Sequence, residues 1–241
     1  MKPLLYSLSL FACSSAVAMT LQCPTHEQQL GAKYSIEYTQ NGQSQLETFE
    51  LWRSNQQVAH AGQNNITEVW QKLSNGQIRP IRYFEDYQHG IEYQPIDLTG
   101  QGSVPAWQDK YQLITQTQLN SMTLKEQHGE GCQQVQRFVL NNESIQLTVE
   151  WLPELHLVKS LQAVRAEHTE QWQLDNLIVA TEQVNAQFNR WDNFQTTDYA
   201  DIGDNESNPL LAKMIKQGFI EHGASGFYNA DGTAIHSGHH H

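Results

Sequence analysis

The sequence predicts a β-rich α+β protein, in which a curved antiparallel sheet, or half-barrel, is covered by two or three helices. Three observations lead to this fold class. Apolar and polar residues alternate along most of the chain, turn-forming residues separate the alternating runs, and three stretches have the spacing of an amphipathic helix. The 241 residues are 39% apolar and 17% charged, which is typical of a folded chain and not of a disordered one.

The first half of the chain is predicted to form a meander. Tyr34, Ile36 and Tyr38 share one face of a strand, and Asn41-Gly42 then supplies a turn that can take a positive φ. The next runs follow each other closely enough to return antiparallel. They are residues 46–53, 57–61, 66–73, 77–84 and 90–94.

The second half repeats the alternation and adds the helices. Four more strands are expected at residues 135–140, 145–151, 155–164 and 168–179. Strands of this kind keep one side wet, so their dry sides need a cover on the concave or open side of the sheet. The candidate helices, each with apolar residues at helical spacing, are residues 105–119, 181–191 and 209–217.

The N-terminus indicates export. Residues 1–18 read as a signal peptide, with Lys2 as its charged end, an apolar stretch, and Ala16-Val17-Ala18 as the cleavage site. We therefore expect a periplasmic protein with one β-rich domain at residues 19–228 and a flexible, His-rich tail at 229–241. The alternative is a lipoprotein acylated at Cys13, although the bulky residue at position 11 and the early position of this cysteine argue against it.

Two cysteines, Cys23 and Cys132, remain after the signal peptide. In an oxidising compartment two cysteines most simply form one disulfide. This bond would close a loop of about 110 residues, for which the chain-entropy model predicts roughly 4 to 5 kcal/mol.

Charge and motifs exclude several functions. The 14 Lys and Arg residues against 26 Asp and Glu give a net charge of −12, which argues against binding a nucleic acid through its phosphates. No later stretch is apolar and long enough for a membrane span. Metalloprotease, Walker and nucleophile-elbow motifs are absent, which argues against an enzyme, although scattered Ser, His and Asp residues could still assemble in space.

The C-terminal histidines are a candidate metal site. His236, His239, His240 and His241 lie within six residues, with His222 upstream, and neutral imidazole is a good ligand for Zn, Cu or Ni. The alternatives are a truncated purification tag or a polar tail without a ligand.

A second candidate metal site is acidic. Asp198, Asp201, Asp204 and Glu206 could surround Ca²⁺, which prefers six to eight oxygen ligands. The alternative is that these acids precede a helix and stabilise its N-terminus.

Aromatic residues suggest an apolar ligand. Trp52, Trp70 and Trp107 fall on predicted strands and on a covering helix, where they could line a cavity, although the helices of the protein could equally fill it.

The run Phe49-Glu50-Leu51-Trp52-Arg53, followed by residues 58–60, 66–70 and Ile91-Glu92-Tyr93, resembles the periplasmic lipoprotein carriers of the LolA/LolB type. The resemblance implies a half-barrel closed by helices and a lipid-like cargo. It assigns no functional residue.

Three functions therefore remain open. The first is a periplasmic binding or carrier protein that holds a lipid-like or apolar ligand. The second is a metal-binding or metal-delivery protein that uses the His-rich C-terminus. The third is a structural or assembly partner of a periplasmic protein, without a small ligand.

Overall fold

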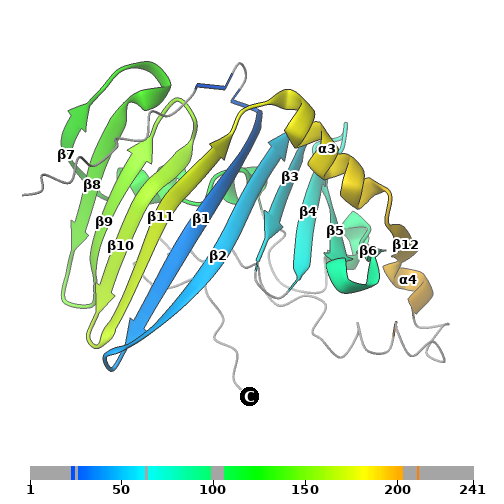
Figure 1. The fold of residues 1–241 in the computed structure, drawn as a ribbon, viewed down its shortest axis with the longest axis horizontal. Helices are drawn as coiled ribbons and strands as arrows, with labels where there is room; N and C mark the ends of the chain where they lie inside the picture. Colours follow the sequence, from blue (N-terminus) through cyan, green and yellow to red (C-terminus); the bar gives the residue numbers. More distant parts are fainter. Residues whose placement is uncertain (1–22, 25–26, 63–64, 99–105, 203–210, 212–241) are drawn as a thin grey trace, which may run out of the picture.

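The structure is a computed structural model, which describes residues 23–24, 27–62, 65–98, 106–202 and 211. Within these residues, twelve strands form one sheet with few short helices, which confirms the predicted fold class (Figure 1). The strands are β1 (Gln29–Gln40), β2 (Gln43–Ser54), β3 (Gln57–Ala61), β4 (Ile66–Lys72), β5 (Ile78–Phe84), β6 (His89–Glu92), β7 (Thr123–His128), β8 (Val135–Asn141), β9 (Gln146–Leu152), β10 (Leu157–Arg165), β11 (His168–Ile178) and β12 (Gln195–Asp198). The helices are α1 (Trp107–Tyr111), α2 (Gln116–Asn120), α3 (Thr181–Asp192) and α4 (Tyr199–Ile202), and single 3-10 turns lie at η1 (Glu85–Tyr87), η2 (Pro95–Leu98) and η3 (Gly131–Gln133).

The sheet consists of two meanders joined side by side. Strands β1 to β6 pair in chain order, as do β7 to β11, and the join is the antiparallel pair β1 and β11. In this pair Ile36 lies opposite Trp172. The join therefore brings together segments that are far apart in the sequence, and it makes the two halves one continuous sheet.

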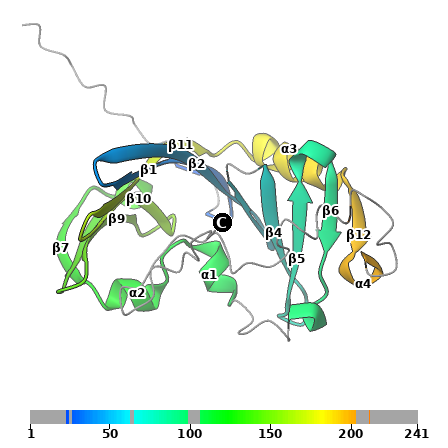
Figure 2. The same cartoon turned by 90° about the horizontal axis from the view of Figure 1, so that it is seen from below.

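Alternation along the strands gives the sheet two faces with different covers. Figure 2 shows the sheet curving around α1 and α2, and we call this side the concave face. Tyr34 and Ile36 belong to its buried cluster, as their spacing predicts. Other strand residues in this cluster are Leu30, Phe49, Leu51, Leu147, Val149, Trp151, Leu161, Ala163, Trp172 and Leu174.

Helix α3 forms where it was predicted, but it covers the opposite face of the sheet. Its buried residues Val184, Phe188 and Trp191 form a separate cluster with side chains of β2 to β5. The physical reason is that these strands are apolar on both faces, so a second cover is needed. Glu85 anchors the helix by accepting hydrogen bonds from Trp191 Nε1 (2.7 Å) and Arg190 (2.9 Å).

The single helix predicted at residues 105–119 is wrong in detail. The structure divides this stretch into α1 and α2, because Gln112 leaves the helical conformation and the chain bends over residues 112–114 before Thr115 begins α2. Thr115 caps α2 reciprocally, since its hydroxyl accepts from Gln118 N while Gln118 Oε1 accepts from Thr115 N. The helix predicted at 209–217 lies outside the described residues except for Leu211, which is helical and buried.

Two strands were not predicted. Strand β7 is exposed along its whole length and pairs only with β8, so it carries no apolar alternation. Strand β12 has four residues and pairs parallel to β6, with His89 Nε2 and Thr197 Oγ1 2.9 Å apart. Both strands lie at the edges of the sheet, where burial on one face is not required.

The disulfide between Cys23 and Cys132 forms as predicted, with the Cα atoms 5.7 Å apart. It ties the start of the described chain to η3, which lies between β7 and β8. The predicted signal peptide, residues 1–18, and the tail at 229–241 lie outside the described residues. No helix in the described ranges is long and apolar enough to cross a membrane.

Candidate functional site

The concave face carries a wall of aromatic and aliphatic side chains. Tyr34, Phe49 and Trp172 come from the three central strands β1, β2 and β11, and their ring centroids lie 5.5 to 6.2 Å apart. Tyr34 donates its hydroxyl hydrogen to the carbonyl of Val158 at 3.0 Å, and its burial raises the pKa of this hydroxyl. The wall is therefore apolar, and the Tyr34 hydroxyl within it is neutral.

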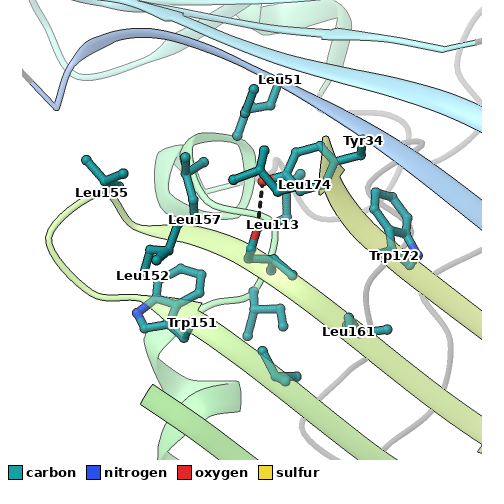
Figure 3. Close-up of a cluster of buried hydrophobic side chains, with 14 of the residues drawn as sticks. Tyr34, Leu51, Leu113, Trp151, Leu152, Leu155, Leu157, Leu161, Trp172 and Leu174 are labelled. Atoms are coloured by element: carbon teal, nitrogen blue, oxygen red, sulfur yellow. Dashed lines mark hydrogen bonds between the residues drawn. The ribbon is translucent and has the colours of Figure 1, made fainter. Parts of the chain in front are cut away.

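A short segment of the same chain lies against this wall. We call residues 107–122, which contain α1 and α2, the cover segment. Leu113, Ile114 and Leu119 are its buried aliphatic side chains, and they belong to the same cluster as the sheet residues. Figure 3 shows Leu113 among side chains from β9, β10 and β11. Because α1 and α2 have five residues each, neither would be stable without these contacts.

Arg53 holds the cover segment on the sheet. Its guanidinium is completely buried and donates to the carbonyls of Tyr111 (2.8 Å), Leu155 (2.6 Å) and His156 (2.7 Å). It also stacks on the Tyr111 ring at 4.0 Å. One side chain of β2 thus connects the end of α1 with the turn between β9 and β10.

His60 holds the neighbouring carbonyl. Its Nε2 atom lies 2.9 Å from the carbonyl oxygen of Lys110, and since a carbonyl only accepts, Nε2 carries the hydrogen. Burial, and then the charge of Lys110, lower the pKa of His60 from 6.5 to about 3, so the ring is neutral. The other ring nitrogen, Nδ1, has no hydrogen-bond partner among the described residues.

Lys110, in α1, is the third buried polar residue where this helix meets the sheet. Its side chain is buried, and its ammonium lies 4.2 Å from the centroid of the Trp70 ring. Burial lowers the pKa of this amine, while the charge of Glu68 acts in the opposite direction. Arg53, His60 and Lys110 therefore form a cationic and polar group at one end of an apolar face.

Comparison with known protein families and with curated protein sequences finds no match.

Solved structures similar to this chain include PNGF-II, with 9% identity, a TM-score of 0.35, and coverage of 78% of this chain and 33% of that one. A chain of the Pseudomonas aeruginosa MucA/MucB complex has 14% identity and a TM-score of 0.32, covering 66% and 56%. A putative outer membrane lipoprotein-sorting protein domain from Vibrio parahaemolyticus has 7% identity and a TM-score of 0.31, covering 69% and 93%. The protein thus spans about a third of the length of PNGF-II.

The structure separates the three predicted tryptophans. Trp70 and Trp107 both belong to or pack against the concave cluster, but Trp52 lies on the opposite face, beneath α3. Trp52 therefore cannot line a site together with Trp70, and this part of the sequence prediction is wrong. Its indole nitrogen donates to Glu50 at 2.8 Å, and its ring packs over Gly31.

Sequence reasoning missed Arg53, His60 and Lys110. A signal for two of them was present, because Arg53 and His60 occupy inward positions of strands in which the next inward residues, Leu51 and Val58, are apolar. A charged or polar residue in such a position is buried only with partners.

The candidate calcium ligands are partly described. Asp198 accepts from Gln94 Nε2 and from the backbone N–H of Ala200, both at 3.0 Å, so it caps the start of α4. Asp201 is exposed, and Asp204 and Glu206 lie outside the described residues. In the described part of the chain, no three His, Cys, Asp or Glu side chains are grouped as metal ligands.

The histidines proposed for Zn, Cu or Ni also lie outside the described residues. These are His222, His236, His239, His240 and His241. Metal binding by the tail stays a prediction from the sequence.

Proposed function

We propose that the protein is an exported binding or carrier protein that holds a lipid-like or apolar chain against the concave face. The observation that carries this proposal is that the cover segment is short compared with the apolar wall beneath it. A broad apolar wall built by side chains of nine strands is covered by two five-residue helices, and these helices are ordered by their contacts with that wall. An apolar guest could replace those contacts with equivalent ones.

The energy of such an exchange is favourable for a guest of ordinary lipid length. Burial of Leu113, Ile114 and Leu119 contributes about 1.5 to 3 kcal/mol each, so lifting all three from the wall costs roughly 5 to 9 kcal/mol. Each methylene of a guest contributes about 0.8 kcal/mol when buried. A chain of about 6 to 11 methylenes would offset the displaced contacts. Trp70 and Trp107 remain candidates for residues that contact the guest.

The proposed compartment is the periplasm. The predicted signal peptide supports it, and so does the disulfide between Cys23 and Cys132, because structural disulfides persist in oxidising compartments.

Two measurements test the proposal. The protein is purified without detergent, and its organic extract is analysed by mass spectrometry for co-purified lipid. An environment-sensitive apolar dye is then titrated into the stripped protein, and we expect one saturable site. If neither lipid nor a saturable site is found, the proposed carrier function is wrong, and the alternative of an assembly partner without a small ligand is favoured.

A pair of variants locates the site. Ala163 is buried on the concave face, whereas its neighbour Gln162 is exposed on the other face of β10. We expect Ala163→Phe to fill guest space and weaken dye binding at least fivefold, and Gln162→Phe to leave it unchanged. Equal effects of the two substitutions would place the site elsewhere.

A further inference from the structure

The two helices of the cover segment contact different parts of the sheet. Helix α1 contacts the first meander, where the Lys110 ammonium lies against the face of Trp70 on β4. Leu113, just after α1, lies among side chains of β9, β10 and β11 (Figure 3). Figure 2 shows α2 towards the β7 end of the sheet. The cover segment therefore bridges the two meanders, and each helix is attached to its own part of the wall.

Helix α1 is attached to the sheet mainly by polar contacts at its C-terminal end. Arg53 donates to the carbonyl of Tyr111, and His60 donates to the carbonyl before it. Trp107 and Tyr111 are only partly buried, and the one buried side chain of α1, Lys110, ends in an ammonium. Water can replace such partners when α1 lifts, because the net contribution of a hydrogen bond is a difference between protein and water partners.

Helix α2 is attached in a different way. Its side chain Leu119 is buried, and the reciprocal cap between Thr115 and Gln118 closes its N-terminus. Only two residues separate its end from β7, whose first residue, Thr123, is paired with β8. Water offers no equivalent of a buried leucine contact. Apolar burial and the chain itself therefore both hold α2 on the sheet.

The stretch between the helices has the features of a pivot. Gln112 is extended, with φ −128° and ψ 140°, and so is Thr115, with φ −73° and ψ 156°. Leu113 and Ile114 form no backbone hydrogen bond with another described residue, yet their side chains are buried. A change in the backbone torsion angles of Gln112 would thus swing α1, while the two aliphatic side chains keep the pivot on the wall.

We propose that α1 is a gate for the concave face, which swings about residues 112–114 while α2 stays in place. The opened gate uncovers the Trp70 end of the wall, and Trp70 is the first side chain of the wall that a guest meets. A guest then enters in two steps, because the three buried aliphatic side chains of the cover segment are displaced only after α1 has lifted. This inference rests on the proposed function, since it assigns the entrance for the same guest.

Amide hydrogen exchange in the stripped, full-length protein tests the gate without any substitution. The reporter for α1 is the amide of Gln112, which donates to the Gln108 carbonyl, and the reporters for α2 are the amides of Leu119 and Met122. After correction for intrinsic rates, we expect the Gln112 amide to exchange at least tenfold faster than the other two in NMR measurements. Equal protection would show that the cover segment moves as one unit, and would overturn the gate.

A pair of variants loosens one helix at a time. Tyr111→Ala removes the ring on which Arg53 stacks, and Leu119→Ala removes the buried side chain of α2. We expect Tyr111→Ala to speed exchange of the Gln112 amide at least threefold and to leave that of Met122 unchanged, and Leu119→Ala to do the reverse. The amides of β1 report any change in global stability. Equal effects on both helices in each variant would contradict a gate formed by α1 alone.

Stopped-flow mixing with the environment-sensitive apolar dye connects the gate with the guest. We expect the association rate constant to rise at least threefold in Tyr111→Ala and to change less than twofold in Leu119→Ala. Faster association in Leu119→Ala alone would place the entrance at α2 and overturn the proposal. If the dye binds to none of the three proteins, the carrier function fails, and the gate fails with it. If the dye binds but the two helices exchange equally, only the gate fails.

Discussion

At the scale of single residues, the cover segment is held by side chains of the sheet and not by backbone pairing. Arg53 and His60, from neighbouring strands, donate to the consecutive carbonyls of Tyr111 and Lys110. These carbonyls end α1, where they have no partner within the helix. The bonds explain why the helix stops at Tyr111 although the apolar spacing continues to Leu119.

Replacing Arg53 is expected to destabilise the protein strongly. Arg53→Met leaves one buried and two partly buried carbonyls without their donors, and we expect a loss of about 3 to 5 kcal/mol in the free energy of unfolding, measured in urea. The control is Arg137→Met, because Arg137 forms only an exposed ion pair with Glu126 and should contribute less than about 1 kcal/mol. A similar loss in both variants would contradict the role given to Arg53.

The buried ring of His60 predicts a pH dependence. Its pKa is about 3 in the folded protein and 6.5 when exposed, so the unfolded chain takes up a proton that the folded protein does not. The resulting stabilisation is complete above pH 6.5 and is lost as the pH falls towards 3, by roughly 3 to 5 kcal/mol.

The variant His60→Gln checks this linkage, because glutamine can still donate to the Lys110 carbonyl but does not titrate. We expect its stability to fall less steeply than that of the wild type between pH 6.5 and 3 in urea unfolding. His128→Gln on the exposed strand β7 is the matched replacement and should follow the wild-type curve. Parallel curves for all three proteins would show that His60 is not the group responsible.

At the scale of elements, the cover segment sets a threshold length for the guest. In a series of linear alcohols, we expect affinity to rise about fourfold per methylene, since about 0.8 kcal/mol is gained for each. Butanol and hexanol should not bind measurably, whereas decanol and dodecanol should. The dye-displacement curve measures this, and affinity independent of chain length would indicate a guest that does not lie along the wall.

Sequence predicted the elements well where one face alone is buried. Ile36 and Val149 lie on strands in which apolar and polar residues alternate, and both are buried as expected. Val184 and Phe188, four residues apart in helix α3, are buried as well. It could not assign Trp52 to a face, because Leu51, Trp52 and Arg53 are all buried and alternation then carries no information. It also could not find β12, whose residues Gln-Thr-Thr-Asp have no apolar pattern.

At the scale of the whole molecule, local sequence patterns could not predict how the two meanders join. The pairing of β1 with β11 depends on contacts between distant segments, and the alternation of each strand is compatible with other neighbours. The candidate site has the same origin, because Arg53, His60 and Lys110 meet only once the cover segment lies across the sheet.

The disulfide should contribute much of the stability. It joins residues separated by 109 positions, for which the chain-entropy model gives about 4 to 5 kcal/mol, and measured values for single disulfides are typically 2 to 4. We expect reduction to lower the free energy of unfolding by about 2 to 4 kcal/mol. The double variant Cys23→Ser, Cys132→Ser should match the reduced wild type and be insensitive to reductant. A variant as stable as the oxidised protein would contradict this expectation.

The long-range seam between β1 and β11 has a consequence for the order in which a newly made chain can mature. Strand β1 pairs with β2 on one side, but its other neighbour, β11, is complete only when nearly three quarters of the polypeptide has emerged, since β11 ends at Ile178 of 241 residues. Until then an unpaired, apolar edge is open to other molecules, and such late closure slows folding. The chain therefore depends on protection from aggregation for longer than a protein in which all paired strands are neighbours in the sequence.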